Sequence, residues 1–330
     1  MRRRDFTAGL LLASATGVLA QEREKQPRIA ILIPSGPIAR ISDAGGGRFY
    51  QAIFDELRRL GDIEGQNITV DRYSGEGRPA GFADLASEVV SRNPQVIVAV
   101  SDPIAQAVHT ASATIPIVWI GGDPILAGLT TSLARPGGNV TGVTVYVGHE
   151  IWGKRLQILK EAAPSASKVG FLEMRTDWAA NEQQLREAGR QLGVLVIAMI
   201  LQESTPSEYR RVFSEIAREQ PEVIVVSSDG ALVPYRQLIV ELVEKSRLPA
   251  IYGWRDYVEA GGLMAYGDDQ AELGRRIAND VHQILGGAKP GDIPIYQPTK
   301  FEFVINLNAA KALGLMIPSA LLASADEVIE

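Results

Sequence analysis

The sequence repeats one short pattern, and this repeat constrains the fold more than any other feature. The segment Pro94-x-Val96-Ile97-Val98-x-x-Ser101-Asp102 recurs 127 residues later as Pro221-x-Val223-Ile224-Val225-x-x-Ser228-Asp229. Each copy is a β-branched run of the kind found in buried strands, with a proline before it and a Ser-Asp pair after it. Equivalent strands in the two halves of a 330-residue chain predict two lobes of similar topology.

Alternating strand and helix patterns surround both copies. In the first half, strand-like runs at residues 28–33, 68–73, 96–100 and 117–120 alternate with helical apolar spacing at 49–60, 82–91 and 105–113. The second half repeats this order, with strand-like runs at 169–174, 194–201, 223–226 and 250–252 and helical patterns at 181–192, 208–218 and 235–245. Such alternation predicts an α/β fold with two similar doubly wound parallel-sheet lobes.

Turn-rich segments indicate where the chain passes between the lobes. We expect the first crossing in a strand at Val140–Val147, the second near Tyr252–Arg255 and the third near Ile295–Lys300, where prolines exclude a regular helix. Three crossings predict a hinge with a cleft between the lobes. On this basis lobe 1 comprises residues 27–143 plus 254–294, and lobe 2 comprises residues 144–253 plus 295–330.

Residues 1–20 predict export. Three arginines precede the apolar run Thr7–Leu19, and the small residues Val18 and Ala20 suit cleavage near Ala20. The segment Arg3-Arg4-Asp5-Phe6 also resembles the twin-arginine export motif. An uncleaved membrane anchor is the alternative, but the run is short for a span. We therefore expect a periplasmic protein with no stable membrane insertion after signal cleavage.

Composition argues against several other functions. The net charge of −6 is a poor match for nucleic acid, which attracts clusters of Lys and Arg. The chain has no cysteine, which excludes disulfides and thiolate catalysis, and its 3 histidines share no close spacing. No Gly-x-Ser-x-Gly nucleophile motif occurs. We expect no catalytic residue, no metal site and no cofactor, and hence a protein that is not an enzyme.

Polar residues at the ends of the expected strands predict where a ligand binds. In open parallel sheets, ligands bind beyond the carboxyl ends of the strands, where helix N-termini present free N–H groups. Ser and Asp are also favoured helix caps, so capping is the alternative to ligand contact. The strand ends supply eight candidate ligand-binding residues: Ser35, Ser101, Asp102, Asp123, Thr176, Asp177, Ser228 and Asp229.

Aromatic residues complete the candidate site. Tyr252 and Trp254 join the ligand-binding set, and Trp119 offers a further ring. Arg175 or Arg255 would add positive charge for a carboxylate, while the aspartates would pair with an amino group. Together these residues predict a small amphipathic solute, an aromatic amino acid or an aromatic carboxylate. A sugar is the alternative, because sugar sites also combine aromatic rings with Asp and Asn.

Longer motifs resemble one known family. They are Ala127-Gly128-Leu129, the stretch Ser132–Gly142, Leu248–Gly253, Glu259–Met264, Pro298–Glu302 and Ala325–Ile329. These motifs resemble the ABC transporter substrate-binding family of the tryptophan-binding TrpX-like proteins. The resemblance implies a type I periplasmic binding fold that closes around a solute, and some members look like aromatic amino-acid binders. We expect a monomer that delivers its solute to an ABC permease and its ATPase. A periplasmic sensor that signals to a membrane receptor is the alternative.

Overall fold

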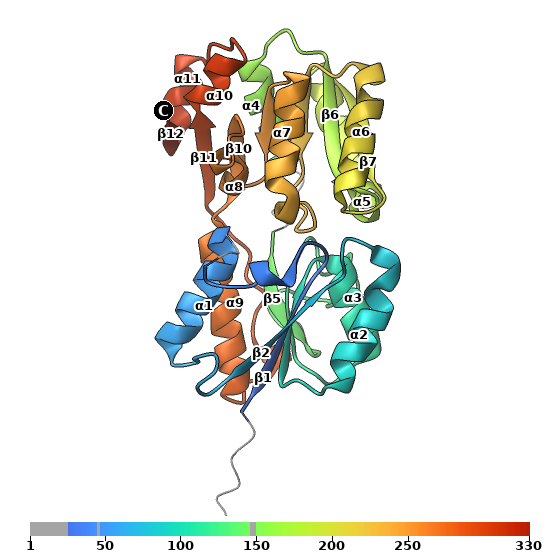
Figure 1. The fold of residues 1–330 in the computed structure, drawn as a ribbon, viewed down its shortest axis with the longest axis vertical. Helices are drawn as coiled ribbons and strands as arrows, with labels where there is room; N and C mark the ends of the chain where they lie inside the picture. The colour runs from blue at the N-terminus through green and yellow to red at the C-terminus, as the bar shows by residue number, and fades with distance from the viewer. Residues whose placement is uncertain (1–25, 45–46, 146–149) are drawn as a thin grey trace, which may run out of the picture.

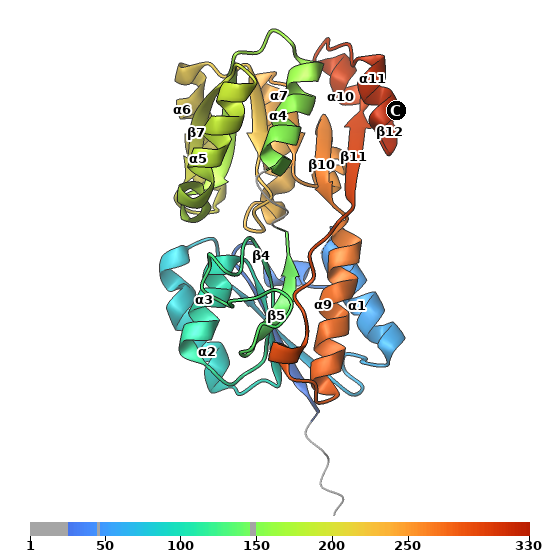
Figure 2. The same cartoon turned by 180° about the vertical axis from the view of Figure 1, so that it is seen from behind.

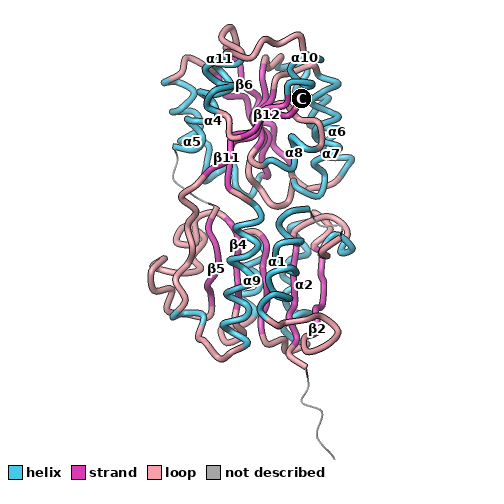
Figure 3. The backbone as a smooth tube through the Cα atoms, turned by 90° about the vertical axis from the view of Figure 1, so that its left-hand side faces the viewer, coloured by secondary structure: helices cyan, strands magenta, loops and turns pink. Residues whose placement is uncertain are grey.

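The computed structural model describes residues 26–44, 47–145 and 150–330. It shows two lobes stacked end to end, each built on one sheet with helices packed against it (Figures 1 and 3). The prediction of a two-lobed α/β fold is therefore confirmed. The predicted signal at residues 1–20 lies outside the described residues, and within the described ones no helix is long and apolar enough to cross a bilayer.

Lobe 1 contains a five-stranded parallel sheet in the order β2-β1-β3-β4-β5. Its strands are β1 (Arg28–Ile33), β2 (Thr69–Ser74), β3 (Val96–Val100), β4 (Ile117–Gly121) and β5 (Val140–Thr144). Every residue of β3 is buried, because helices cover both faces of the sheet. Helices α2 (Phe82–Ser91) and α3 (Asp102–Ala111) cover one face, and α1 (Gly47–Leu60) and α9 (Gln270–Leu285) cover the other.

Lobe 2 contains a seven-stranded sheet in the order β12-β11-β10-β9-β8-β6-β7, in which only the β10–β11 pair is antiparallel. The strands are β6 (Lys168–Met174), β7 (Leu195–Leu201), β8 (Val223–Val226), β9 (Ala250–Tyr252), β10 (Met264–Asp268), β11 (Phe301–Asn306) and β12 (Glu327–Ile329). The helices are α4 (Glu150–Ala162), α5 (Arg175–Gln191), α6 (Pro206–Glu219), α7 (Arg236–Ser246), α8 (Arg255–Glu259), α10 (Leu307–Ala312) and α11 (Ser319–Ser324).

The two sheets share one strand order. Numbered within its own lobe, the parallel part of each sheet runs 2-1-3-4-5, and the repeated sequence segments form the third strand of each, β3 and β8. In this order the direction of winding reverses between the first and third strands, and ligands of such sheets bind at that point. The switch points are β1/β3 in lobe 1 and β6/β8 in lobe 2.

The second crossing between the lobes lies later in the chain than predicted. We expected it at Tyr252–Arg255, but β9 continues through α8 into β10, which pairs with β9 and β11 in lobe 2. Helix α8 is thus the short connection between two parallel neighbours, and β10 belongs to the lobe 2 core. The assignment of residues 254–268 to lobe 1 is therefore wrong.

The chain enters lobe 1 for the second time only with α9 and then returns to lobe 2 at β11 (Figure 2). On the way, Tyr296 still exchanges backbone hydrogen bonds with Gly142 and Thr144 of lobe 1. Helix α9 packs along α1, more than 200 residues earlier in the sequence. The remaining predicted lobe boundaries, at residues 27–143, 144–253 and 295–330, stay predictions.

Candidate functional site

A cavity of about 160 Å³ lies between the lobes, at the ends of strands from both sheets. Ser35 follows β1 and Ser101 follows β3, while Glu173 is the last residue but one of β6 and Ser228 follows β8. Both switch points therefore contribute to one cavity, as the strand-end rule predicts. A cavity of about 150 Å³ holds one benzene molecule, so this volume suits a small solute.

Seven of the ten predicted ligand-binding residues line this cavity. They are Ser35, Ser101, Asp102, Asp177, Ser228, Asp229 and Trp254. The carboxyl ends of strands from both halves of the chain meet at this cavity, so the strand-end rule selected residues that lie close together. Whether they contact a solute stays a prediction.

The other three predicted residues do not line the cavity. The Oδ1 atom of Asp123 accepts backbone N–H bonds two and three residues further on, at 2.8 and 3.2 Å, and so closes a turn. Thr176 lines a smaller neighbouring pocket and donates to Asp177 at 2.7 Å. Tyr252 is 1% exposed and stacks on Tyr257 in the lobe 2 core, with ring centroids 4.9 Å apart. The prediction that these three residues line the main cavity is therefore wrong. Local hydrogen bonds hold Asp123 and Thr176 elsewhere, and core packing holds Tyr252.

The tryptophans divide between the core and the cavity. Trp119 is fully buried in the lobe 1 core, where its Nε1 donates to Asp102 at 2.9 Å. Trp178 packs beside Phe171 in the lobe 2 core. Trp152 and Trp254 line the cavity instead. The ring surface available to a solute therefore comes from the last two.

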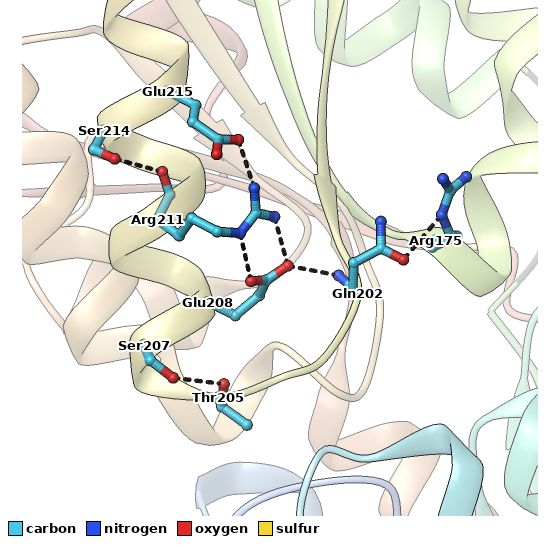
Figure 4. Close-up of polar contacts among 8 residues, drawn as sticks. All are labelled: Arg175, Gln202, Thr205, Ser207, Glu208, Arg211, Ser214 and Glu215. Atoms are coloured by element: carbon cyan, nitrogen blue, oxygen red, sulfur yellow. Dashed lines mark hydrogen bonds and ion pairs between the residues drawn. The ribbon is translucent and has the colours of Figure 1, made fainter.

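The two arginines expected near a carboxylate lie elsewhere. Arg175 Nε donates to the side chain of Gln202 at 3.0 Å, and the backbone N–H of Gln202 donates to Glu208 (Figure 4). Arg255 forms ion pairs with Glu259 at 2.9 Å and Glu327 at 2.6 Å. Neither arginine lines the cavity, because each already has an anionic or amide partner on the surface of lobe 2.

Arg155 on α4 brings positive charge to the cavity wall. Its side chain is 2% exposed, and it donates from Nε to the Tyr266 carbonyl at 2.8 Å and from Nη2 to the Gly253 carbonyl at 3.3 Å. Its Nη1 atom is buried without a hydrogen-bond partner. Burial lowers the pKa of Arg155 to about 10, against the attraction of the Asp268 carboxyl. The guanidinium therefore stays charged at neutral pH, and the N–H donors of its Nη1 atom remain unpaired.

Three carboxyl groups face one another in lobe 2, and we call Glu173, Asp177 and Asp229 the acidic cluster. Oxygens from all three lie within 4.8 Å of one another. Glu173 is 2% exposed, and the hydroxyl of Ser227 donates to it at 2.7 Å. Burial, with the nearby Asp177, raises the pKa of Glu173 to about 8 and holds that of Asp229 well above its usual range. The acidic cluster would thus be stabilised by a positive charge.

The equivalent aspartate of lobe 1 has different surroundings. Asp102 accepts from Trp119 Nε1 at 2.9 Å and from the backbone N–H of Gly122 at 3.0 Å. Burial, with Asp177, raises the pKa of Asp102 to about 7. The preceding Ser101 has a φ of 84° and a ψ of 153°, a region that L-residues rarely adopt, and its side chain caps no helix N–H. The cavity wall of lobe 1 therefore stores backbone strain.

Unpaired polar atoms concentrate at the cavity. Within residues 26–44, 47–145 and 150–330, eight buried side-chain nitrogen or oxygen atoms lack a hydrogen-bond partner. Six of the eight belong to residues that line the cavity: Ser101, Arg155, Trp254, Asp256, Asp268 and Gln270. A buried unpaired polar atom costs about 1–3 kcal/mol, and native proteins keep few of them. A polar solute in the cavity would offset this cost.

Direct contacts hold the lobes together around the cavity. Ser35 Oγ of lobe 1 donates to the Ala231 carbonyl of lobe 2 at 2.6 Å, and the Ser204 N–H of lobe 2 donates to the Gly77 carbonyl at 2.9 Å. The guanidinium of Arg40 also donates to the Pro234 carbonyl. A solute between the lobes would therefore be enclosed by both.

Comparison with known families decides the class of this two-lobed protein. A family model described as ABC transporter substrate binding protein matches residues 38–329. The chain belongs to this family. Its members are substrate-binding proteins, which is not an enzyme class.

Individual relatives agree with this assignment. The tyrosine-binding protein of Clostridioides difficile (strain R20291) is 29% identical over 275 residues, which cover 82% of this chain and 77% of that protein. A conserved domain protein of Vibrio cholerae is 26% identical and superposes with a TM-score of 0.80, covering 92% of this chain and 100% of the other. A Streptococcus pneumoniae ABC domain solved with L-Trp gives a TM-score of 0.79 at 24% identity with the same coverage. These likenesses confirm the type I periplasmic binding fold.

Sequence reasoning missed five charged residues of the cavity wall, which are Arg40, Arg155, Glu173, Asp256 and Asp268. Two of them carry a readable signal. Arg155 lies three residues after Trp152 and four before Leu159, so helical spacing places a charge on the apolar face of α4. Glu173 is a charge inside an otherwise buried strand. Asp268 was missed because no strand was predicted at Met264–Asp268, so the strand-end rule had no strand end to apply there.

Proposed function

We propose that this chain is the exported solute-binding subunit of an ABC importer, and that it captures an aromatic amino acid or aromatic carboxylate between its lobes. The observation that carries this proposal is the convergence of unpaired polar atoms and the Trp152 and Trp254 rings on one cavity between the lobes. Aromatic rings supply apolar contact area, and the polar atoms fix the orientation of a solute. The names of the tyrosine-binding relative and the L-Trp complex support the same class of solute.

The route and partners follow from the sequence and the family. The arginine-rich start and apolar run of residues 1–20 support export to the periplasm through the twin-arginine route, with cleavage near Ala20. Membership in the family supports delivery of the solute to an ABC permease and its ATPase. We propose that the protein works as a monomer, because one chain supplies both walls of the cavity.

A ligand panel tests this function. Titration with aromatic amino acids, aromatic carboxylates and sugars, followed by tryptophan fluorescence and melting temperature, is expected to give a response for an aromatic solute. A solute at 100 times its Kd stabilises the folded state by about 2.7 kcal/mol, which raises the melting temperature measurably. Trp254→Phe is expected to reduce the fluorescence response.

Trp178→Phe is the matched control, because Trp178 packs in the lobe 2 core away from the cavity. It is expected to leave the response intact. A response to a sugar together with silence from every aromatic compound would show that the solute class is wrong. Solute binding without transport by a reconstituted permease would instead favour the sensor alternative.

A further inference from the structure

We propose that the acidic cluster is an ammonium subsite, so that the solute of this protein carries a protonated amine and a plain aromatic carboxylate is not its ligand. This inference rests on the proposed function and narrows the class of solute. The acidic cluster consists of Glu173, Asp177 and Asp229, and all three residues line the cavity.

The spacing of the cluster matches an ammonium group. An –NH₃⁺ group directs three N–H donors at tetrahedral angles and accepts no hydrogen bond. Carboxylate oxygens about 2.8 Å from its nitrogen then lie about 4.6 Å from one another. The three carboxyl groups of the cluster each offer an oxygen, and these oxygens lie within 4.8 Å of one another. One ammonium group can therefore be paired with all three.

Hydrogen bonds fix the carboxyl groups in this arrangement. Glu173 accepts from the Ser227 hydroxyl at 2.7 Å and from the Asn181 amide at 3.3 Å. Asp177 accepts from the Thr176 hydroxyl at 2.7 Å, and Asp229 accepts from the Ala231 N–H at 2.7 Å. Each carboxyl is thus held by its own part of lobe 2. The subsite is preorganised, which reduces the entropy lost on binding.

A second observation points to a ligand in the same cavity. The Nη1 atom of Arg155 and the Nε1 atom of Trp254 are buried donors without partners, and their side chains are 2% and 4% exposed. Both residues line the cavity together with the acidic cluster. Unpaired donors on one part of the wall and carboxyl groups on another suit a solute that carries an acceptor as well as an amine. An amino acid has both groups.

Charged groups from both lobes surround the acidic cluster. Asp102 of lobe 1 lies in the cavity wall close enough to Asp177 for their charges to repel. The buried hydroxyls of Tyr209 and Tyr257 lie near Asp229, and Arg155 contributes positive charge. Negative groups outnumber positive ones around the cluster, so a bound cation would stabilise it.

The same environment predicts how affinity depends on pH. Burial raises the pKa of Glu173 to about 8, so the cluster holds protons near neutral pH. An ammonium displaces these protons, and its affinity therefore rises between about pH 6 and pH 8, by up to about tenfold per pH unit for each proton released. A carboxylate without an amine is expected to show no such increase.

The test pairs each aromatic amino acid with its deamino analogue. Tryptophan, tyrosine and phenylalanine are titrated by calorimetry against indolepropionate, hydroxyphenylpropionate and phenylpropionate. We expect each deamino acid to bind at least about 30-fold more weakly than its parent, because it leaves the acidic cluster unpaired. A deamino acid that binds as tightly as its parent would overturn the subsite and leave the proposed function standing.

The variant Asp229→Asn sharpens the test. We expect it to weaken the amino acid at least about 30-fold while leaving the deamino acid unchanged or improved. Asp280→Asn is the matched control, since Asp280 is a buried carboxyl on α9 outside the cavity. Equal weakening of both ligands by Asp229→Asn would mean that Asp229 only supports the fold, which contradicts the proposal.

Two further outcomes decide against it. If Ca²⁺ or Mg²⁺ alone raises the melting temperature, and if EDTA abolishes amino-acid binding, the acidic cluster is a metal site. If the whole aromatic panel is silent, the aromatic solute of the proposed function fails and the ammonium subsite fails with it.

Discussion

Ser101 and Asp102 in lobe 1 correspond to Ser228 and Asp229 in lobe 2, and both pairs follow the third strand of a sheet and line the cavity. Their surroundings differ. Asp102 accepts hydrogen bonds from Trp119 and Gly122, and the strained backbone belongs to Ser101. Asp229 instead lies among other carboxyl groups. Duplicated sequence has thus fixed where these residues lie, while the neighbours that each lobe supplies decide what they do.

From this comparison we infer that the lobe 1 aspartate holds the cavity wall in position, and that the lobe 2 aspartate binds the solute. In lobe 1 the aspartate links the end of β4 to the start of α3, since Trp119 and Gly122 belong to or follow β4. In lobe 2 the aspartate meets Glu173 and Asp177. Like charges placed together cost stability, and such perturbed carboxyl groups are concentrated at functional sites.

The largest expected effect is the pH dependence of stability, to which Glu173 of lobe 2 is expected to contribute more than Asp102 of lobe 1. Burial raises the pKa of Glu173 from 4.5 to about 8 and that of Asp102 from 3.8 to about 7. A raised pKa gives stability that is complete below the unfolded-state pKa and is lost as pH rises to the folded-state value. The free energy of unfolding of the parent protein is therefore expected to fall between about pH 5 and pH 8. Glu173 contributes up to about 4 kcal/mol of this fall and Asp102 up to about 3 kcal/mol, so Glu173→Gln and Asp102→Asn are each expected to abolish the corresponding part.

Urea unfolding of the ligand-free protein at several pH values measures this effect. Asp280→Asn is the control, because burial also raises the pKa of Asp280 to about 7, but in α9 away from the cavity. It is expected to flatten the pH dependence as Asp102→Asn does, without changing ligand affinity. A parent protein whose stability does not fall over this pH range would contradict the raised pKa values.

A smaller effect concerns the two serines. Ser101 has a φ of 84°, which glycine adopts without strain, whereas Ser228 is not among the described residues with positive φ. Ser101→Gly is expected to stabilise the protein by about 1 kcal/mol, and Ser228→Gly to destabilise it by about 1 kcal/mol. Thermal unfolding of the two variants provides the measurement. A loss of stability in both would show that Ser101 carries no relievable strain.

The smallest effect lies within lobe 1. Asp123 closes a turn outside the cavity, so Asp123→Ala is expected to change solute affinity by less than about twofold and to cost at most about 1 kcal/mol of stability. Asp102→Ala is its counterpart in the cavity wall, and it is expected to weaken binding more. Calorimetric Kd values decide the point, and equal effects of the two substitutions would remove the distinction between turn and wall.

Most of the parallel strands could be predicted from the sequence. Buried parallel strands are rich in β-branched residues, and β3 and β8 carry the same run. Alternation and repetition together predicted β1 to β5 and β6 to β9, but not β10, β11 and β12. The error at β10 has a local cause. Helix α8 has only five residues, so the connection from β9 to β10 lacks the helical pattern that marks the other connections of the sheet.

The candidate site was predictable only in part, because the strand-end rule finds residues through the backbone. It located Ser101 and Asp229 without any contact information. It did not locate Arg155, which reaches the cavity from the side of a helix, or Asp268, which follows from the β10 error. It also placed Tyr252 in the site, although this ring stacks on Tyr257 in the core. Side-chain direction and packing decide these positions, and a single sequence does not encode them by spacing alone.

Helices α1 and α9 pack together in lobe 1, but the ribosome synthesises them far apart in time. Helix α1 presents Phe49, Ile53 and Leu57 to a seam that α9 completes with Leu273 and Ile277. On a ribosome that adds about 5–20 residues per second, more than 200 residues separate the two helices, so the seam stays open for roughly 10 to 40 seconds. Lobe 1 thus waits for most of lobe 2 to be synthesised before it can bury its own apolar face.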